Sequence, residues 1–433
     1  MLIKYEHLNL KIVVLLLFYF ITSCETNDKR FDKTESQAFS SEKFKKIDDF
    51  FEKSILNNDV PGAVALIRRN NRIIYNKAFG YSDVENKIKF SNKDIFRIAS
   101  NTKAVTSLGV LILWQKGKFN LDDPIENYIP AFKNPTILES FKKEDSTYTV
   151  KNAKNKITIR HLLTHTSGIG YGKIDQFDSF QAIYQKNNII DLFTTKPITI
   201  KENIEKLATL PLHHEPGEAF TYGEGLDVLG YLIELISGMP LNQFFKKHIF
   251  EPLEMDDTFF YLPPSRYNRL VPVQTKKAGF WMKHDLNYWP EEEFYDVNYP
   301  VKGSKVFYSG GAGLSSTTED FSNFLQLFLN RGIYKGRRIL TEKTIDLIYV
   351  NQIPHLPNSP VGLVFGIIEK DNHHEEKKDN IIFHWGGYFS TYYFIDPKED
   401  LIMILYKQTR PYDTSSLNFK YKALVNESLI NND

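Results

Sequence analysis

The sequence predicts an α+β fold in which one antiparallel β-sheet is flanked by helices and carries an inserted, mostly helical subdomain. Three observations lead to this prediction. Strand-like runs stand near the start of the globular part, similar runs return near the C-terminus, and the region between them is dominated by helical patterns and loops. We therefore expect a single sheet that both ends of the chain build together.

The bulk composition is that of an ordinary globular protein. The chain has 433 residues, 42% of them hydrophobic, so it is long enough to bury a large core. Its 54 basic and 53 acidic residues leave a net charge of +1, and no global field favours nucleic acid or an anionic membrane. The overall charge therefore predicts no nucleic-acid or membrane partner. The sequence does not indicate the oligomeric state.

The N-terminus predicts export and a lipid anchor. Lys4 and Lys11 precede an apolar run, residues 12–21, which is too short to span a bilayer of about 30 Å but suits the core of an export signal. Cys24, the only cysteine, ends an Ile-Thr-Ser-Cys stretch that resembles a bacterial lipoprotein cleavage box. We expect a signal peptide over residues 1–23, lipidation of Cys24 and attachment to the cell envelope, with a plain signal peptide as the alternative.

A polar tether, residues 24–43, is expected to precede one globular domain, residues 44–430, because the tether is charged and poor in aromatic residues. The domain opens with strand-like runs on both sides of an Asn-Asn pair, which is typical of a hairpin. The first expected elements are a helix over residues 44–56 and two strands over 62–68 and 72–80, joined at Asn70-Asn71.

The next element is an amphipathic helix that we expect to start at Ser100 and to end near Gly117, since apolar residues recur between them at helical spacing. Its start is unusual. Lys103 occupies the third helical position, where the helix dipole disfavours a cation by about 0.3–1 kcal/mol. Local rules are broken most often at functional sites, so this start is a candidate site.

The rest of the domain is expected to run through a helical middle region, residues 121–340, into C-terminal strands. A stretch rich in tyrosine, tryptophan and proline within this region is a candidate lid or pocket wall. The expected elements are helices over 159–163 and 226–236, a polar insertion over 171–200, the candidate lid over 263–304, strands over 364–369, 381–387 and 401–407, a charged hairpin tip over 371–380, and a final helix over 416–429.

Ser100 and Lys103 form a candidate nucleophile and base. Residues three apart on a helix point to the same side, so the two side chains are expected to be neighbours. A serine hydroxyl needs an adjacent base to become a nucleophile. A lysine can serve when it is neutral, a form that burial and the positive end of a helix both favour.

Two later places add candidates. Tyr222 follows a Pro-Gly turn and leads into a helix, where it is either a second proton carrier or an ordinary core residue. In Trp385-Gly386-Gly387 the glycines on an apolar strand either let a ligand approach the backbone or mark a β-bulge.

Taken in order, Ser100-Asn-Thr-Lys103, Tyr222-Gly-Glu224 and Trp385-Gly-Gly387 resemble the S-x-x-K, Y-x-N and K/H/W-x-G elements of the serine β-lactamase and penicillin-binding-protein superfamily. The nearest branch is that of class C β-lactamases, D-peptidases and related serine esterases. Further similar blocks extend the resemblance over residues 44–408, and they are Thr158–Ile169, Glu215-Pro-Gly, Gly311–Asp320 and Tyr392–Asp400.

The resemblance implies a role for each candidate. Ser100 is the expected acylated nucleophile, Lys103 its proton acceptor, and Tyr222 the acid and base of the two half-reactions. The backbone N–H groups of Ser100 and Tyr388 are the expected oxyanion hole, which stabilises the developing negative charge. The resemblance implies a small-molecule or peptide acyl substrate, with neither metal nor organic cofactor.

Two departures from the family pattern indicate the substrate. Glu224 replaces the asparagine of the second motif, and Trp385 stands where β-lactamases carry lysine. In the family these positions help to hold a substrate amide and a substrate carboxylate, so an anionic β-lactam loses an attractive charge here. Tryptophan is typical of the esterase branch. We expect an esterase or D-peptidase-like serine hydrolase rather than an efficient β-lactamase.

Two alternatives stay open at this stage. If Glu224 pairs with Lys103 and keeps it charged, the chain is a catalytically impaired sensor or binding module on the same fold. A metal hydrolase built on His213, His214 and Glu215 is the other alternative, although their spacing fits no usual zinc motif. His161 and His165 are expected to serve packing or helix capping.

Overall fold

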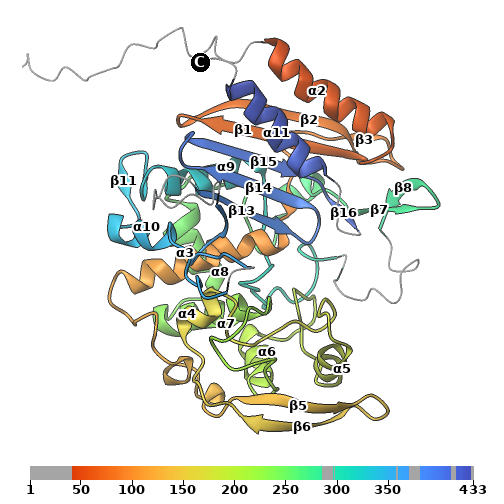
Figure 1. The fold of residues 1–433 in the computed structure, drawn as a ribbon. Helices are drawn as coiled ribbons and strands as arrows, with labels where there is room; N and C mark the ends of the chain where they lie inside the picture. Colours follow the sequence, from red (N-terminus) through yellow and green to blue (C-terminus); the bar gives the residue numbers. More distant parts are fainter. Residues whose placement is uncertain are drawn as a thin grey trace, which may run out of the picture.

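A seven-stranded antiparallel sheet lies at the centre of the fold (Figure 1). The computed structural model describes residues 41–284, 296, 298–356, 359–369, 381–410 and 416–430. In spatial order the strands are β12 (Gly366–Glu369), β13 (Ile381–Gly387), β14 (Thr391–Asp396), β15 (Leu401–Tyr406), β1 (Gly62–Arg69), β2 (Arg72–Asp83) and β3 (Ile88–Lys89). The register, for example Val64 opposite Tyr406, joins the two ends of the chain in one sheet, which confirms that expectation.

Both faces of the sheet are covered, so its central strands read as nearly continuous apolar runs. Successive side chains of a strand point to opposite faces. On β1, Ala63, Ala65 and Ile67 therefore enter the core beneath α2 (Ser41–Leu56) and α11 (Leu417–Ile430). Val64 and Leu66 enter the larger core on the opposite face, where α9 (Thr318–Leu329) packs against β1 and β15.

The first hairpin forms as its turn residues predict. Asn70 and Asn71 have φ of 50° and 62°, and Arg69 pairs with Arg72 across them. Asparagine is one of the few residues that adopt this left-handed conformation readily, which allows a two-residue turn between twisted strands. The expected helix before this hairpin is confirmed as α2 and the expected C-terminal helix as α11.

A mostly helical region between the two halves of the sheet forms the lower part of Figure 1. The predicted helix over residues 159–163 is confirmed, and that over 226–236 is confirmed with its end at Gly238 in the left-handed conformation (φ 68°). The helices of this region are α3 (Thr102–Trp114), α4 (Ile159–Leu163), α5 (Asp178–Lys186), α6 (Ile200–Leu207), α7 (Gly225–Ser237) and α8 (Leu241–Phe245). A further helix, α10 (Glu342–Ile348), is drawn at the left of Figure 1 beside the sheet.

Short strand pairs complete the described fold, and several lie where loops were expected. Residues 136–152 form a hairpin whose exposed polar sequence carries no clear apolar alternation. Part of the candidate lid is also a hairpin, and the polar insertion contains α5. The pairs are β4 (Phe96–Arg97) with β9 (Ser315–Ser316), β5 (Thr136–Lys142) with β6 (Thr147–Asn152), β10 (Ile333–Tyr334) with β11 (Arg337–Arg338), and β7 (Gln274–Lys277) with both β8 (Phe280–Lys283) and β16 (Thr409–Arg410).

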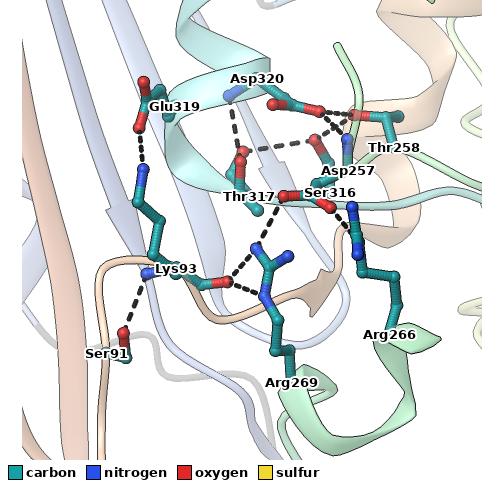
Figure 2. Close-up of polar contacts among 10 residues, drawn as sticks. All are labelled: Ser91, Lys93, Asp257, Thr258, Arg266, Arg269, Ser316, Thr317, Glu319 and Asp320. Atoms are coloured by element: carbon teal, nitrogen blue, oxygen red, sulfur yellow. Dashed lines mark hydrogen bonds and ion pairs between the residues drawn. The ribbon is translucent and has the colours of Figure 1, made fainter.

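A polar cluster fastens the start of α9 to neighbouring loops (Figure 2). The Asp320 carboxylate accepts hydrogen bonds from the Asp257 N–H and the Thr258 hydroxyl, both at 2.8 Å. Asp257 in turn pairs with Arg269 at 2.8 Å, and Lys93 pairs with Glu319 at 2.9 Å. The pair of Lys93 is exposed and contributes little to stability. The buried bonds of Asp320 instead orient α9 beneath the sheet.

Two predictions concern residues outside the described ranges. The signal peptide with Cys24, and the charged hairpin tip over residues 371–380, both fall there. Among the residues that the structure does describe, no helix combines the length and the apolar character needed to cross a membrane.

Candidate active site

Most of the predicted site residues line one cleft of about 390 Å³ between the sheet and the helical region. Its lining residues are Ser100, Ile174, Phe220, Tyr222, Trp385, Gly386, Gly387 and Tyr388. The fold thus brings together three motifs that lie more than 100 residues apart in the sequence. Lys103 lies beneath the cleft with 4% of its surface exposed, and Glu224 is fully buried away from it.

Ser100 sits in a 3₁₀ turn, Ala99–Asn101, that runs directly into α3. The expectation that Ser100 caps the helix is wrong, because Asn101 takes the capping position and neither side chain caps the helix. Ala99 adopts φ of 42°, a conformation that costs a residue with a side chain about 1–2 kcal/mol. The turn leaves the Ser100 hydroxyl free of capping and directs it into the cleft.

The Lys103 amine lies among three oxygen atoms. Its Nζ is 2.8 Å from the Tyr171 hydroxyl, 2.9 Å from the Gly311 carbonyl oxygen and 3.5 Å from Ser100 Oγ. These contacts confirm the expected proximity of Ser100 and Lys103. An ammonium group has three hydrogens to donate, so this arrangement can satisfy all of them in a buried place.

Tyr222 stands over the same amine. Lys103 Nζ lies 4.7 Å from the centre of the Tyr222 ring, and the ring packs against His165 at 4.8 Å and Trp385 at 5.9 Å between centroids. The Tyr222 hydroxyl forms no hydrogen bond with any described residue. It is therefore available to a molecule in the cleft, as a proton carrier must be.

The end of β13 is fastened to the turn that carries Ser100. A Cβ atom on Gly387 would lie 2.3 Å from the Ile98 carbonyl oxygen, so only glycine permits this approach. Thr391 Oγ1 donates to the same carbonyl at 3.3 Å and accepts from Asn101 Nδ2 at 3.3 Å. Gly387 thus lets the end of β13, which leads directly into Tyr388, approach the turn that carries Ser100.

Glu224 does not face the cleft or contact Lys103. It precedes α7 with none of its surface exposed, and Asn203 Nδ2 donates to its Oε2 at 3.4 Å. Burial, strengthened by the nearby carboxyl groups of Asp191 and Asp227, raises the pKa of Glu224 well above its ordinary value. Among the described contacts, Lys103 Nζ binds Tyr171, Gly311 and Ser100 and forms no ion pair with Glu224.

Two residues outside the three motifs contact this arrangement. Tyr171 stands at the start of the expected polar insertion, and its position between Gly170 and Gly172 indicates a close backbone approach. Asp227 on α7 accepts hydrogen bonds from the Ser309 hydroxyl at 2.6 Å and the Gly311 N–H at 3.1 Å. Asp227 thereby holds the residue whose carbonyl binds Lys103, and no sequence motif marks it.

The histidines take structural places. His161 completes a capping box with Thr158 at the start of α4, which confirms its expected capping role. His213 pairs with Asp175 at 3.0 Å, whereas Nε2 of His214 contacts the Thr221 hydroxyl at 2.9 Å. Within the described ranges, no cluster of three metal-binding side chains occurs.

Burial also decides the state of His165. Its ring stacks on Trp385 with 15° between the planes and packs against Tyr222. Burial, assisted by the charge of Lys103, lowers the pKa of His165 to about 3. The ring is therefore neutral over the physiological range and forms part of the aromatic support behind the cleft.

Comparisons with known proteins agree with this geometry. A profile of the family described as Beta-lactamase matches residues 44–427. Protein Rv1367c of Mycobacterium tuberculosis is 28% identical over 366 residues, which cover 81% of this chain and 86% of that protein. Esterase EstB of Burkholderia gladioli is 26% identical over 370 residues, covering 84% and 90%.

A solved structure has the same fold. EstCE1, described as a hydrolase with promiscuous acyltransferase activity, aligns with a TM-score of 0.70 over 92% of this chain and 99% of its own. Its sequence identity of 22% supports a statement about the fold alone. The predicted fold class is thereby confirmed.

Proposed function

The chain belongs to the Beta-lactamase family, and from this premise we propose that it is a serine hydrolase that acts on ester or small acyl substrates through an acyl-enzyme on Ser100. One observation carries the proposal. Lys103 Nζ lies 3.5 Å from Ser100 Oγ and 4.7 Å from the Tyr222 ring, at the base of an open cleft. A nucleophile, a base and a second proton carrier thus meet where a substrate can enter.

In the proposed acylation step, Ser100 Oγ bonds to the substrate carbonyl carbon while its proton passes to Lys103 Nζ. The bond to the leaving alcohol then breaks as the Tyr222 hydroxyl gives that alcohol a proton, and Lys103 restores the tyrosine proton. In the second half-reaction, a water molecule attacks the acyl carbon and loses a proton to Lys103 and Tyr222. The bond from the acyl carbon to Ser100 Oγ then breaks, and the same groups return a proton to the serine. General acid and base transfers of this kind typically contribute about 10²–10⁴-fold to a rate.

The proposed oxyanion hole consists of the backbone N–H groups of Ser100 and Tyr388. Both residues line the cleft, and the contacts of Gly387 and Thr391 with Ile98 keep their backbones close. A preorganised N–H donor that strengthens its bond in the transition state is worth about 3–4 kcal/mol.

The lining of the cleft supports a neutral acyl substrate. The described lining residues have aromatic, aliphatic or hydroxyl-bearing side chains or are glycines, with no lysine, arginine or carboxylate among them, and Lys103 lies beneath them. Trp385 occupies the position where the family's β-lactamases place a cation, so a substrate carboxylate meets no compensating charge there. The relative named as an esterase agrees with this preference.

A fluorophosphonate probe tests the nucleophile directly. We expect one adduct on wild-type Ser100 and no adduct on Ser100→Ala, with Ser107→Ala as a matched control on α3 that labels like wild type. Equal labelling of Ser100→Ala, or an unlabelled wild type, would remove the proposal.

A substrate panel tests the reaction class. The panel contains p-nitrophenyl esters of short acyl chains, nitrocefin and D-Ala-D-Ala peptides. We expect the rate of hydrolysis to be higher for the esters than for nitrocefin. Faster turnover of the peptides would assign the D-peptidase activity instead. Nitrocefin turnover above the esters would contradict the preference drawn from Trp385.

The alternative of an impaired sensor module rested on a pairing of Glu224 with Lys103. Lys103 directs its hydrogen bonds to Tyr171, Gly311 and Ser100 instead. A stable acyl-enzyme without product release is the result that would still favour the sensor.

We also propose that the chain is exported and anchored in the cell envelope by a lipid on Cys24. The apolar run before this residue and its position after Ile-Thr-Ser support the proposal. Replacement Cys24→Ser should move the protein from the membrane fraction to the soluble fraction. An unchanged distribution would contradict a lipid anchor at this residue.

A further inference from the structure

Two buried carboxyl groups, those of Glu224 and Asp191, lie together behind the candidate site, where Asn203 Nδ2 donates both to Glu224 Oε2 and, at 3.0 Å, to the carbonyl of the residue that precedes Asp191. Glu224 Oε2 accepts a hydrogen bond from Asn203, whereas Oε1 has no donor among the described residues. A buried acceptor without a donor is unfavourable, so a proton on Glu224 that is donated to Asp191 is the arrangement that satisfies Oε1. Burial and the neighbouring Asp191 both raise the pKa of Glu224, in agreement with this sharing.

Asp191 uses its two oxygen atoms to hold one loop. Its Oδ1 accepts the Gly172 N–H at 2.8 Å, and its Oδ2 accepts the Lys173 N–H at 2.7 Å. The approach is so close that a Cβ atom on Gly172 would lie 2.8 Å from Oδ2. Glycine at this position is therefore a requirement of the carboxylate contact.

The loop held by Asp191 carries Tyr171, the direct partner of Lys103. Its other side is held as well, because the Glu224 N–H donates to the Gly170 carbonyl at 3.3 Å. Glu224 thus contacts the loop through its backbone and supports it through Asp191. The tyrosine between these attachments has little freedom to leave the amine.

The position of Tyr171 decides where the Lys103 lone pair points. The Gly311 carbonyl can only accept, so one N–H of the amine is committed to it at 2.9 Å. In the neutral form that the proposed base requires, N–H groups donated to Gly311 and, at 2.8 Å, to Tyr171 leave the lone pair of the amine for its third neighbour, Ser100 Oγ at 3.5 Å. Loss of the tyrosine contact would let the amine rotate, and the lone pair would face Ser100 for a smaller fraction of the time.

We propose that Glu224 and Asp191 are positioning residues, a proton-sharing carboxyl pair that holds the Tyr171 loop and thereby aims the Lys103 base at Ser100. The inference rests on the proposed function of Ser100 and Lys103. In this proposal Glu224, which replaces the family's asparagine, supports the site from behind and does not contact the substrate.

Kinetics of four variants and one control variant test the pair. Glu224→Leu keeps the size but removes the donor, and we expect kcat on p-nitrophenyl acetate to fall about tenfold with KM within twofold. Glu224→Gln retains an N–H donor and should recover most of that loss. Tyr171→Phe should lose about as much as Glu224→Leu, and the double variant should lose no more than about threefold beyond either, because both changes act on one contact. Glu234→Gln, which changes a half-buried acid on α7, the helix that Glu224 precedes, is the control and should change kcat less than twofold.

Hydrogen–deuterium exchange of the peptide that covers residues 170–175 gives a readout independent of activity. The Gly172 and Lys173 amides should exchange at least tenfold faster in Glu224→Leu than in wild type and Glu224→Gln. An inactive wild type with this pattern would sink the proposed function but leave the positioning intact. Unchanged exchange in Glu224→Leu, or multiplicative losses in the double variant, would overturn the inference. An unaltered kcat in Tyr171→Phe would overturn it as well, and this measurement is available even if Glu224→Leu fails to fold.

Discussion

Between pH 7.5 and pH 5, the free energy of unfolding should fall by about 2 kcal/mol less in His165→Phe than in the wild type. Burial lowers the pKa of His165 to about 3, whereas an unfolded chain has a histidine pKa near 6.5. Between these values the unfolded state binds a proton that the native state does not, so the free energy of unfolding falls as the pH is lowered from 6.5 toward 3. At pH 5 the difference amounts to about 2 kcal/mol, and at pH 7.5 it is close to zero.

Phenylalanine keeps the ring that stacks on Trp385 and removes only the titration. His165 has φ of 57°, so the replacement adds a conformational penalty of about 1 kcal/mol, but this penalty is the same at both pH values and cancels in the comparison. Urea unfolding followed by circular dichroism at pH 7.5 and 5 measures the change in stability of each protein. His165→Phe should lose about 2 kcal/mol less than wild type over this interval.

Exposed His355 provides the matched control, because His355→Phe should follow the wild-type dependence on pH. If wild type and His165→Phe lose equal stability between the two pH values, the ring is accessible to protons in the native state. The account of a dry aromatic support behind the cleft would then be refuted.

Three further predictions concern the chemistry of the cleft. Lys103→Met should lower kcat on p-nitrophenyl acetate by about 10²–10⁴-fold because the base is lost, and a loss below threefold would assign the proton transfer to another group. Gly387→Ala should lower kcat by about 10²–10³-fold, because its Cβ atom would lie 2.3 Å from the Ile98 carbonyl oxygen and the resulting shift would displace the Tyr388 N–H donor. A kcat within twofold of the wild-type value would place the oxyanion hole elsewhere. Trp385→Lys should raise acylation by nitrocefin about tenfold, because a charged hydrogen bond to the substrate carboxylate is worth about 1.5 kcal/mol, and an unchanged rate in a stopped-flow assay would show that no carboxylate reaches this position.

The order of the main strands and helices could be predicted because each of them carries a local signal. The apolar runs that became β1, β13 and β15, and the Asn70-Asn71 turn, are local patterns that tertiary packing preserves. The β5–β6 hairpin escaped prediction because its residues are mostly exposed and lack apolar alternation. The start of α3 was misplaced because the backbone at Ala99 takes a strained turn that no local preference favours.

The three motifs could be found in the sequence because they are short and ordered. Their family was confirmed by the match over residues 44–427. Their partners could not be found in this way. Tyr171 and Asp227 reach Lys103 only through the fold, the first directly and the second through Gly311, and neither belongs to a motif with a fixed spacing from the lysine.

By itself the sequence predicted the fold class, the order of the main elements, and the neighbouring serine and lysine of the proposed site, because periodicity and a spacing of three residues are properties of the local chain. The tertiary structure alone decided the charge state around them. Whether Glu224 is an ion beside Lys103 or a protonated acid beside Asp191 depends on burial and on the groups that surround it. Those surroundings come from segments distant in the sequence, and their electrostatic effect exists only once the fold has excluded water from them.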